Sequence, residues 1–366
     1  MTSFPRTSRS LRVLGAFAAL ALVLAACGSS SKSSSSTGTT TAGGGGGKVT
    51  LNGSGSTFQQ TFNQIAIQAF QQANPNITVT YKGVGSGQGK TDLSTKDVDF
   101  AGSDSTIKEA DLPSFQGGKV LYFPTVAAPI TVSFNVSGLD KLQLSGPTLA
   151  QIFNQKIKTW NDSAIAADNP GAKLPSTNIV VVRRADKSGT TKNFTTFLAD
   201  QGSSNWPYPA DEVWPQADQA GTQAGQGNPG VAQIVKQTDG AVGYVDYSDA
   251  VQSGLKTASI KNAAGNYVAP SIEGATAAVA GATIKADLTY NPINATGAQA
   301  YPITSPTWIL VYQKQTDKAK GSALKTFLTF ILNDGQGLAN EAKYAALPDS
   351  LKQKAIAQLD QLQIPA

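Results

Sequence analysis

The sequence predicts an α/β protein built from two domains. Its 366 residues are 40% apolar, which is enough to bury one large core or two medium ones. A strand, a small-residue loop and a helix follow one another near residue 50 and again near residue 180. Two similar segments with an aromatic-Pro pair, at 123–134 and 301–312, are candidates for connections between the domains.

The first half of the chain shows this pattern most clearly. Strands are expected at 49–51, 77–81 and 98–100. The helix that follows Thr57 stops at Asn74-Pro75, because proline cannot continue it. Its apolar positions have roughly helical spacing: Phe58, Phe62, Ile65, Ile67 and Phe70. A glycine-rich turn at 83–89 then leads into a helical turn at 90–94.

The second half repeats the pattern with a basic loop. A strand at 179–182 is followed by a loop at 183–189 and a helix at 190–198. The stretch 201–228 is rich in Pro, Gly and Gln and is expected to be a loop. The chain closes with helices around 322–332 and 350–362.

The two aromatic-Pro segments suggest how the domains are connected. Phe123-Pro124 precedes an apolar run at 129–134, and Tyr301-Pro302 precedes one at 308–312. Proline fixes φ and removes a backbone donor, which suits an extended crossover at a domain edge. We interpret them as the two interdomain connections, so that the first domain is discontinuous. Two unrelated edge strands remain the alternative.

The N-terminus has the pattern of an export signal. Three arginines precede an apolar run at 13–26, and the run ends at Cys27, the only cysteine. Leu24-Ala25-Ala26-Cys27 resembles the bacterial lipobox, in which the thiol is acylated, for example with palmitate. An ordinary signal peptide with an incidental cysteine is the alternative. We expect a signal peptide at 1–26 and, at 27–47, a lipidated Cys27 with a flexible Ser/Thr/Gly tether.

Charge and composition exclude several classes of function. The formal charge of +5 includes the arginines at 6, 9 and 12, so the rest of the chain carries about +2 and no nucleic-acid partner is expected. The absence of histidine excludes imidazole metal sites and histidine-based triads. A carboxylate-only metal site at Asp97, Asp99 and Asp104, serving a secreted phosphatase, is the remaining enzyme hypothesis. We expect no catalytic residue, cofactor or metal.

Three loops rich in Gly, Ser and Thr each open a helix, at 53–58, 83–89 and 184–190. Helix starts present unpaired N–H groups and a partial positive charge to an anion. A helix cap or a tight turn explains any single loop equally well, but three together, with Arg184 in the third, favour an oxyanion site. The segment 84–91 approaches a nucleotide-binding P-loop, yet Val84 stands where its first glycine is required.

These loops carry a resemblance to a known family. The motifs lie at 53–58, 81–89, 98–104, 181–190 and 301–304, and the resemblance extends from Lys48 to Pro348. The chain resembles the phosphate-binding component, periplasmic or lipoprotein, of the high-affinity phosphate ABC transporter. The Arg-x-Asp-x-Ser-Gly-Thr loop together with Ser103-Asp104 is the specific part. The resemblance implies a type II periplasmic binding-protein fold, with lobe one at 48–126 and 303–366, lobe two at 127–302, and a two-segment hinge.

The resemblance also implies a set of phosphate-binding residues. Arg184 supplies the cation, Asp186 orients it, and Asp104 accepts the proton that phosphate carries. The full set implied is Ser56, Thr57, Phe58, Ser86, Asp104, Arg184, Asp186, Ser188, Gly189 and Thr190. Lys187 and Gly87-Gln88 depart from the family pattern without changing a matched ligand position.

The expected function is therefore capture of inorganic phosphate and its delivery to ABC permease subunits, without enzymatic activity. The protein is expected to be monomeric and lipid-anchored at the extracytoplasmic face of the cell membrane. Sulfate or molybdate is the alternative ligand. The alternative for each residue is structural: a surface ion pair for Arg184 and Asp186, a helix cap at Ser56 and Thr57, and a turn residue at Asp104.

Overall fold

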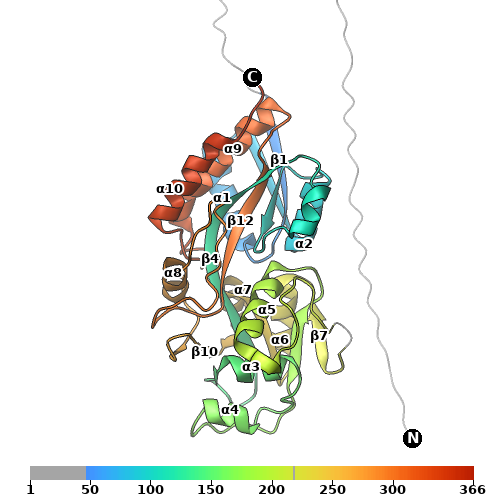
Figure 1. Cartoon of the computed structure of the whole chain (residues 1–366), viewed down its shortest axis with the longest axis vertical. Coiled ribbons are helices and arrows are strands. Elements are labelled where there is room, and N and C mark those ends of the chain that lie inside the picture. Colours follow the sequence, from blue (N-terminus) through green and yellow to red (C-terminus); the bar gives the residue numbers. More distant parts are fainter. Residues whose placement is uncertain (1–46, 217–218) are drawn as a thin grey trace, which may run out of the picture. The chain divides into compact units, whose positions relative to one another are not determined.

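The computed structural model describes residues 47–216 and 219–366. The predicted signal peptide, Cys27 and all of the tether but Gly47 lie outside the described residues. In the described part, two α/β lobes are connected by β4 (Val120–Asn135) and β12 (Thr304–Tyr312). Figure 1 shows β4 passing from the lobe drawn at the top into the lobe below it.

Most strands belong to one long sheet, in the order β2-β1-β3-β12-β4-β8-β6-β7, with β9 paired to β4. A small second sheet has the order β11-β10-β5. Besides β4 and β12, the strands are β1 (Val49–Gly55), β2 (Ile77–Gly83), β3 (Phe100–Ser103), β5 (Gln143–Leu144), β6 (Val180–Arg184), β7 (Thr222–Gly225), β8 (Ala241–Asp246), β9 (Lys256–Thr257), β10 (Ser259–Lys261) and β11 (Tyr267–Val268).

Helices cover the sheet in both lobes (Figure 1). The α-helices are α1 (Gln60–Ala73), α2 (Ser86–Ser94), α3 (Gly146–Phe153), α4 (Ser163–Asp168), α5 (Gly189–Gly202), α6 (Gly227–Gln237), α7 (Tyr247–Ser253), α8 (Ile272–Ala280), α9 (Lys318–Leu332) and α10 (Asp349–Gln358). Short 3₁₀ turns occur at Glu109–Ser114, Ser203–Asn205, Asp334–Leu338 and Leu359–Gln361. No helix among the described residues is both long and apolar enough to cross a membrane.

The lobes are defined here by their elements. Lobe one contains β1, β2, β3, β12, the first half of β4, and helices α1, α2, α9 and α10. Lobe two contains the second half of β4, β6 to β9, and helices α3 to α7. β1 is parallel to β2 and β3, and β6 is parallel to β7 and β8. The strand–loop–helix prediction for both lobes is therefore confirmed.

The two aromatic-Pro segments lie side by side at the boundary of the lobes. Pro129 of β4 is paired with Thr304 at the start of β12, and Pro124 is paired with Trp308. Beyond Pro129, β4 leaves β12 and pairs with β8 instead. The alternative of two unrelated edge strands is wrong, because both strands are central. Each proline is tolerated where the pairing changes partner or shifts register.

Several predicted boundaries are wrong in an instructive way. α2 begins at Ser86, so the expected glycine-rich turn at 83–89 is half helical, and the helix places Ser86 at its first turn. β3 begins at Phe100 and not at Val98. The stretch 201–228 contains β7 and the start of α6, because small residues there pack closely rather than remaining irregular.

The core of lobe two supports the loop after β6. Tyr244 is fully buried and stacks on Phe194 with a centroid separation of 4.5 Å. Its hydroxyl accepts a hydrogen bond from the Arg184 backbone N–H at 3.1 Å and contacts Thr191 Oγ1 at 2.7 Å. The packed aromatic core therefore fixes both the end of β6 and the start of α5.

Candidate functional site

The predicted site residues all follow the carboxyl ends of parallel strands. Ser56 follows β1, Ser86 follows β2 and Asp104 follows β3 in lobe one. In lobe two, Arg184 ends β6, and residues 186–190 lead into α5. In open α/β sheets, ligands bind outside the carboxyl ends of the strands. The fold therefore brings to one place residues that are up to 134 positions apart in the sequence.

Asp104 is held by two serines of lobe one. Ser56 Oγ lies 2.7 and 2.6 Å from the two carboxylate oxygens of Asp104. Ser86 Oγ lies 3.3 Å from Oδ2 and accepts a hydrogen bond from the Asp104 backbone N–H at 3.2 Å. The carboxylate is 1% exposed. Asp104 is thus a buried and oriented acceptor, which argues against the interpretation as a turn residue.

Burial raises the pKa of Asp104 to about 6. Hydrogen bonds from Ser56 and Thr307 and the positive charge of Arg184 act in the opposite direction but only partly offset the loss of hydration. The group therefore titrates between mildly acidic and neutral pH.

Arg184 is the cation of lobe two, and Asp186 fixes its guanidinium. Arg184 Nε donates to Asp186 Oδ1 at 2.8 Å, and Nη2 donates to Oδ2. Burial by itself would raise the pKa of Asp186, but Arg184 and the Gly227 N–H hold it below its usual value. The two side chains are only 1% and 9% exposed. The pair is thus buried, and the interpretation as a surface ion pair is wrong.

The start of α5 contributes the hydroxyl groups of Ser188 and Thr190 to the site. Ser188 caps the helix by accepting a hydrogen bond from the Thr191 N–H at 3.1 Å, and its own N–H donates to Glu212 O at 3.0 Å. The Ser188 hydroxyl proton therefore remains to be donated. Thr190 Oγ1 accepts a hydrogen bond from Arg184 Nη1 at 3.4 Å.

Backbones from the two lobes approach too closely for side chains at two glycines. A Cβ on Gly189 would lie 2.6 Å from Ser86 Oγ and 2.8 Å from Asp104 Cβ. Gly85 has φ +96°, and a Cβ there would lie 2.3 Å from Asp186 Oδ2. Nearby, the Gly87 N–H donates to Lys187 O at 3.1 Å. The lobes therefore meet around the site, with the Lys187 side chain directed to solvent.

The first loop contributes Thr57 and Phe58. The Phe58 N–H donates to Ser56 Oγ at 3.0 Å, so Ser56 both caps this turn and holds Asp104. Thr57 Oγ1 faces lobe two, where it contacts Asn228 of α6. Asn228 was missed by the sequence reasoning because its segment was assigned to a loop. Gly225 and Gly227, which come just before it in the same small-residue pattern as the other loops, were the available signal.

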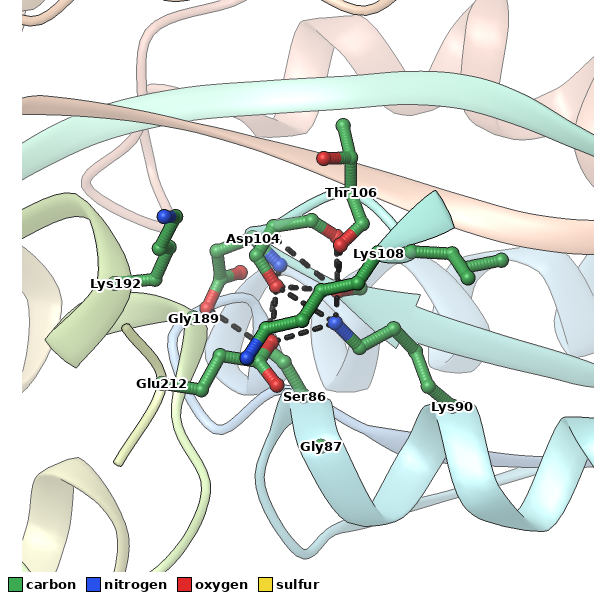
Figure 2. A network of polar contacts seen from close by, with 12 residues as sticks. Ser86, Gly87, Lys90, Asp104, Thr106, Lys108, Gly189, Lys192 and Glu212 are labelled. Atoms are coloured by element: carbon green, nitrogen blue, oxygen red, sulfur yellow. Dashed lines mark hydrogen bonds and ion pairs between the residues drawn. The ribbon is translucent and has the colours of Figure 1, made fainter. Parts of the chain in front are cut away.

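A second missed feature is an ion pair between the lobes, Lys90 with Glu212 (Figure 2). Lys90 Nζ lies 2.6 Å from Glu212 Oε1 and donates to Ser105 Oγ at 3.1 Å and Thr106 O at 3.2 Å. Glu212 Oε1 also accepts from the Ser105 hydroxyl. Lys90 belongs to the P-loop-like segment, but α2 already begins at Ser86, so residues 86–89 are helical and do not form the loop that a nucleotide site needs.

The alternative metal site does not assemble. Asp99 is occupied by Lys320 Nζ at 2.9 Å and by the Asn52 N–H at 2.8 Å, whereas Asp104 faces Ser56. Within residues 47–216 and 219–366, no group of three or more potential ligand side chains could hold a metal ion.

Comparison with known proteins identifies the family of the chain. A family model described as a PBP superfamily domain matches residues 33–335. The chain is 35% identical over 311 residues to the phosphate-binding protein PstS of Xylella fastidiosa, covering 83% of each sequence. It is 34% identical over 359 residues to the phosphate-binding protein PstS 3 of Mycobacterium tuberculosis, covering 93% of this chain and 95% of the relative.

Solved structures share the fold at lower sequence identity. A high-affinity periplasmic phosphate-binding protein, PfluDING, bound with phosphate, superposes with a TM-score of 0.71 at 24% identity, covering 84% of this chain and 93% of that one. A putative phosphate ABC transporter substrate-binding protein with bound phosphate from Clostridium perfringens gives 0.62 at 15% identity, covering 82% and 100%. The two-lobed α/β prediction is confirmed, and the chain belongs to the PstS family of phosphate-binding proteins, within the PBP superfamily.

Proposed function

We propose that this chain captures inorganic phosphate between its two lobes and delivers it to the permease of an ABC importer. The observation that carries the proposal is that a buried hydrogen-bond donor, the Arg184 guanidinium, and a buried acceptor, the Asp104 carboxylate, lie at the same site. A guanidinium fixed by Asp186 comes from lobe two, and a carboxylate fixed by Ser56 comes from lobe one. A tetrahedral oxyanion that still carries a proton complements both groups.

The proposed ligands divide into groups that touch phosphate and groups that hold them. Direct donors are the hydroxyls of Thr57, Ser188 and Thr190, the backbone N–H groups of Gly189 and Thr190, and the Arg184 guanidinium. The Ser86 hydroxyl and the Phe58 N–H donate to Asp104 Oδ2 and Ser56 Oγ in this structure, so they would turn to phosphate only when it binds. Ser56 and Asp186 act one step away, because their bonds are already directed to Asp104 and Arg184.

Asp104 is the proposed acceptor of the proton on phosphate. Full charges in the site are few: Arg184 is balanced by Asp186, which leaves the Asp104 carboxylate as an excess negative charge. Such a group repels an anion unless the anion donates a hydrogen bond to it. Monohydrogen phosphate meets this requirement and sulfate at neutral pH does not.

As a PstS-family protein, the chain serves transport and is not an enzyme. The proposed location is the extracytoplasmic face of the cell membrane, with a lipid on Cys27 as the anchor and residues 28–47 as the tether. Proposed partners are phosphate, the permease subunits and the membrane through this anchor, with the protein itself a monomer. The division at 48–126 with 303–366 and at 127–302 is our proposal for the lobe boundaries.

Titration calorimetry of the purified chain with phosphate and with sulfate tests this function. Tight, stoichiometric phosphate binding with much weaker sulfate binding is expected. Equal binding of both anions, or of molybdate in preference to phosphate, would favour a general oxyanion carrier instead. Turnover of a phosphate ester would favour the phosphatase alternative.

A further inference from the structure

Asn228 connects the two lobes at the site through its amide and its backbone. It lies in the first turn of α6 and is fully buried. Its Nδ2 lies 3.2 Å from Thr57 Oγ1 of lobe one and 3.2 Å from Thr190 Oγ1 of lobe two. Its backbone N–H also donates to Thr57 Oγ1, at 3.1 Å. One side-chain amide thus uses its two N–H bonds on two threonines of opposite lobes.

The Thr57 hydroxyl has a determined direction as a result. A hydroxyl has one proton to donate and two lone pairs with which to accept. The backbone N–H and the Nδ2–H of Asn228 fill both lone pairs of Thr57 Oγ1. The hydroxyl therefore cannot accept a further hydrogen bond, and its proton must point away from Asn228.

Thr190 is in the same situation on the other lobe. Its Oγ1 accepts from Asn228 Nδ2 and, at 3.4 Å, from Arg184 Nη1. Both lone pairs are again occupied by donors, so the hydroxyl can act only as a donor. Among the residues that the structure describes, neither threonine hydroxyl donates to a protein acceptor.

The orientation of the amide decides this arrangement. The nitrogen faces both hydroxyls, and Asn228 Oδ1 has no hydrogen-bond partner in the described part of the chain. The opposite orientation would place Oδ1 against the hydroxyls, where it would accept their protons and withdraw them from any ligand. A test of the role of Asn228 therefore has to separate donation to the hydroxyls from simple packing.

We propose that Asn228 is a positioning residue that commits the hydroxyls of Thr57 and Thr190 to donate to the bound oxyanion. This inference rests on the proposed function, because both threonines are proposed phosphate ligands. Since one hydroxyl belongs to each lobe, Asn228 completes this orientation only when the lobes are closed. Closure of the lobes and the orientation of the two hydroxyl donors are therefore linked through Asn228. Asp104 has the complementary role, because it supplies the acceptor for the proton on phosphate.

The experiment is a mutational cycle with phosphate affinity, measured by calorimetry, as the readout. Asn228→Ala and Asn228→Leu are each made in the wild-type chain and in the Thr57→Val/Thr190→Val chain. Valine keeps the shape of threonine without the hydroxyl, and leucine keeps the volume that alanine removes. Asn169→Ala is the control, because Asn169 is also buried in lobe two but its amide donates to Gln143 O and Ile165 O, neither of which belongs to a proposed ligand.

In the wild-type background, each Asn228 replacement that folds should weaken phosphate binding by at least about tenfold, since two directed donors to an anion are lost. In the Thr57→Val/Thr190→Val chain, the factor by which an Asn228 replacement weakens phosphate binding should be less than a third as large, because no hydroxyl is left to orient. Asn169→Ala should lower the unfolding midpoint and leave phosphate affinity unchanged.

A fold-loss that is as large in the valine background would assign Asn228 to packing alone and overturn the inference while the proposed function stands. A wild-type affinity retained in Asn228→Ala would overturn it as well. If the wild-type chain itself binds no phosphate, the proposed function fails first, and the inference fails with it.

Discussion

Lys90 and Glu212 come from opposite lobes and form a buried ion pair, with 2.6 Å between Nζ and Oε1. Both side chains are about nine-tenths buried, at 10% and 9% exposure. The pair is coupled to the site at both ends: Lys90 shares α2 with Ser86, and the Glu212 carbonyl accepts the Ser188 N–H at 3.0 Å. Figure 2 shows it beside Asp104 and Gly189. The pair thus stabilises the arrangement in which the lobes meet.

Glu212→Gln should weaken phosphate binding by about tenfold or more, mainly through faster dissociation. Closure would then bury the Lys90 charge without its partner, and an unpaired buried charge costs several kcal/mol. Stopped-flow measurement of phosphate release gives the dissociation rate directly.

Lys108 and Asp211 provide a matched control, because they also join the lobes, at 2.7 Å, but are 52% and 36% exposed. Asp211→Asn should change the release rate less than threefold, as expected for a solvated pair. If Glu212→Gln and Asp211→Asn changed the phosphate release rate equally, burial of the Lys90–Glu212 pair would not explain its effect on binding.

Arg184→Ala should abolish most of the phosphate affinity, because the anion loses its buried cation and Asp186 is left as an unpaired charge next to it. The expected loss is at least a hundredfold, measured by calorimetry. Lys187→Ala, three positions away with an exposed side chain, should alter affinity less than threefold. A loss below threefold for Arg184→Ala would exclude this residue as a ligand.

Cys27→Ala should release the protein from membranes without altering phosphate affinity, because the Ser/Thr/Gly tether separates the proposed anchor from the folded lobes. Fractionation of cells into membrane and soluble parts, followed by titration of the released protein, measures both properties. Tight membrane association of the variant would point instead to retention of the apolar segment at 13–26.

Asp104 should make the stability of the phosphate-free protein depend on pH. Its pKa is about 6 in the folded chain, against an ordinary value of 3.8 that applies to the unfolded chain. Between pH 3.8 and about pH 6 the folded state therefore binds more protons than the unfolded state. The free energy of unfolding therefore falls as the pH rises from about 4 to about 6, by on the order of 3 kcal/mol from this group. Asp104→Asn should stabilise the protein at pH 7 and have little effect at pH 4, as measured by chemical denaturation. A stabilisation of the same size at both pH values would contradict this origin.

The sequence predicted those parts of the site that lie on loops with a local signature. The Gly/Ser/Thr loops ending in Thr57 and Thr190, together with Ser86 and Asp104, all converge, because each follows a parallel strand and such strands end at the same edge. The pairing of β4 with β12 could not be read from the sequence with certainty, because an aromatic-Pro segment is compatible with an edge strand as well.

Asn228, Lys90 and Glu212 escaped prediction for a different reason. Each acts through a partner in the other lobe, 171 residues away for Asn228 and 122 residues away for Lys90 and Glu212. Local composition carries no information about such distant contacts. Near Asn228 and Glu212, the Pro, Gly and Gln content also favoured a loop, although tertiary packing forms β7 and α6 there.

The central claim is selective capture of phosphate, and the ratio of phosphate to sulfate affinity in the wild type and in Asp104→Asn tests it most directly. Asparagine keeps the shape of Asp104, removes its charge and can donate to an anion oxygen. Sulfate, which has no proton to donate, is then no longer repelled by a carboxylate. Competitive titration at fixed pH and ionic strength should show a strong preference for phosphate in the wild type. In Asp104→Asn the ratio should narrow by at least about tenfold, equivalent to roughly 1.4 kcal/mol. An unchanged ratio, or a wild type that binds sulfate as tightly as phosphate, would contradict the account.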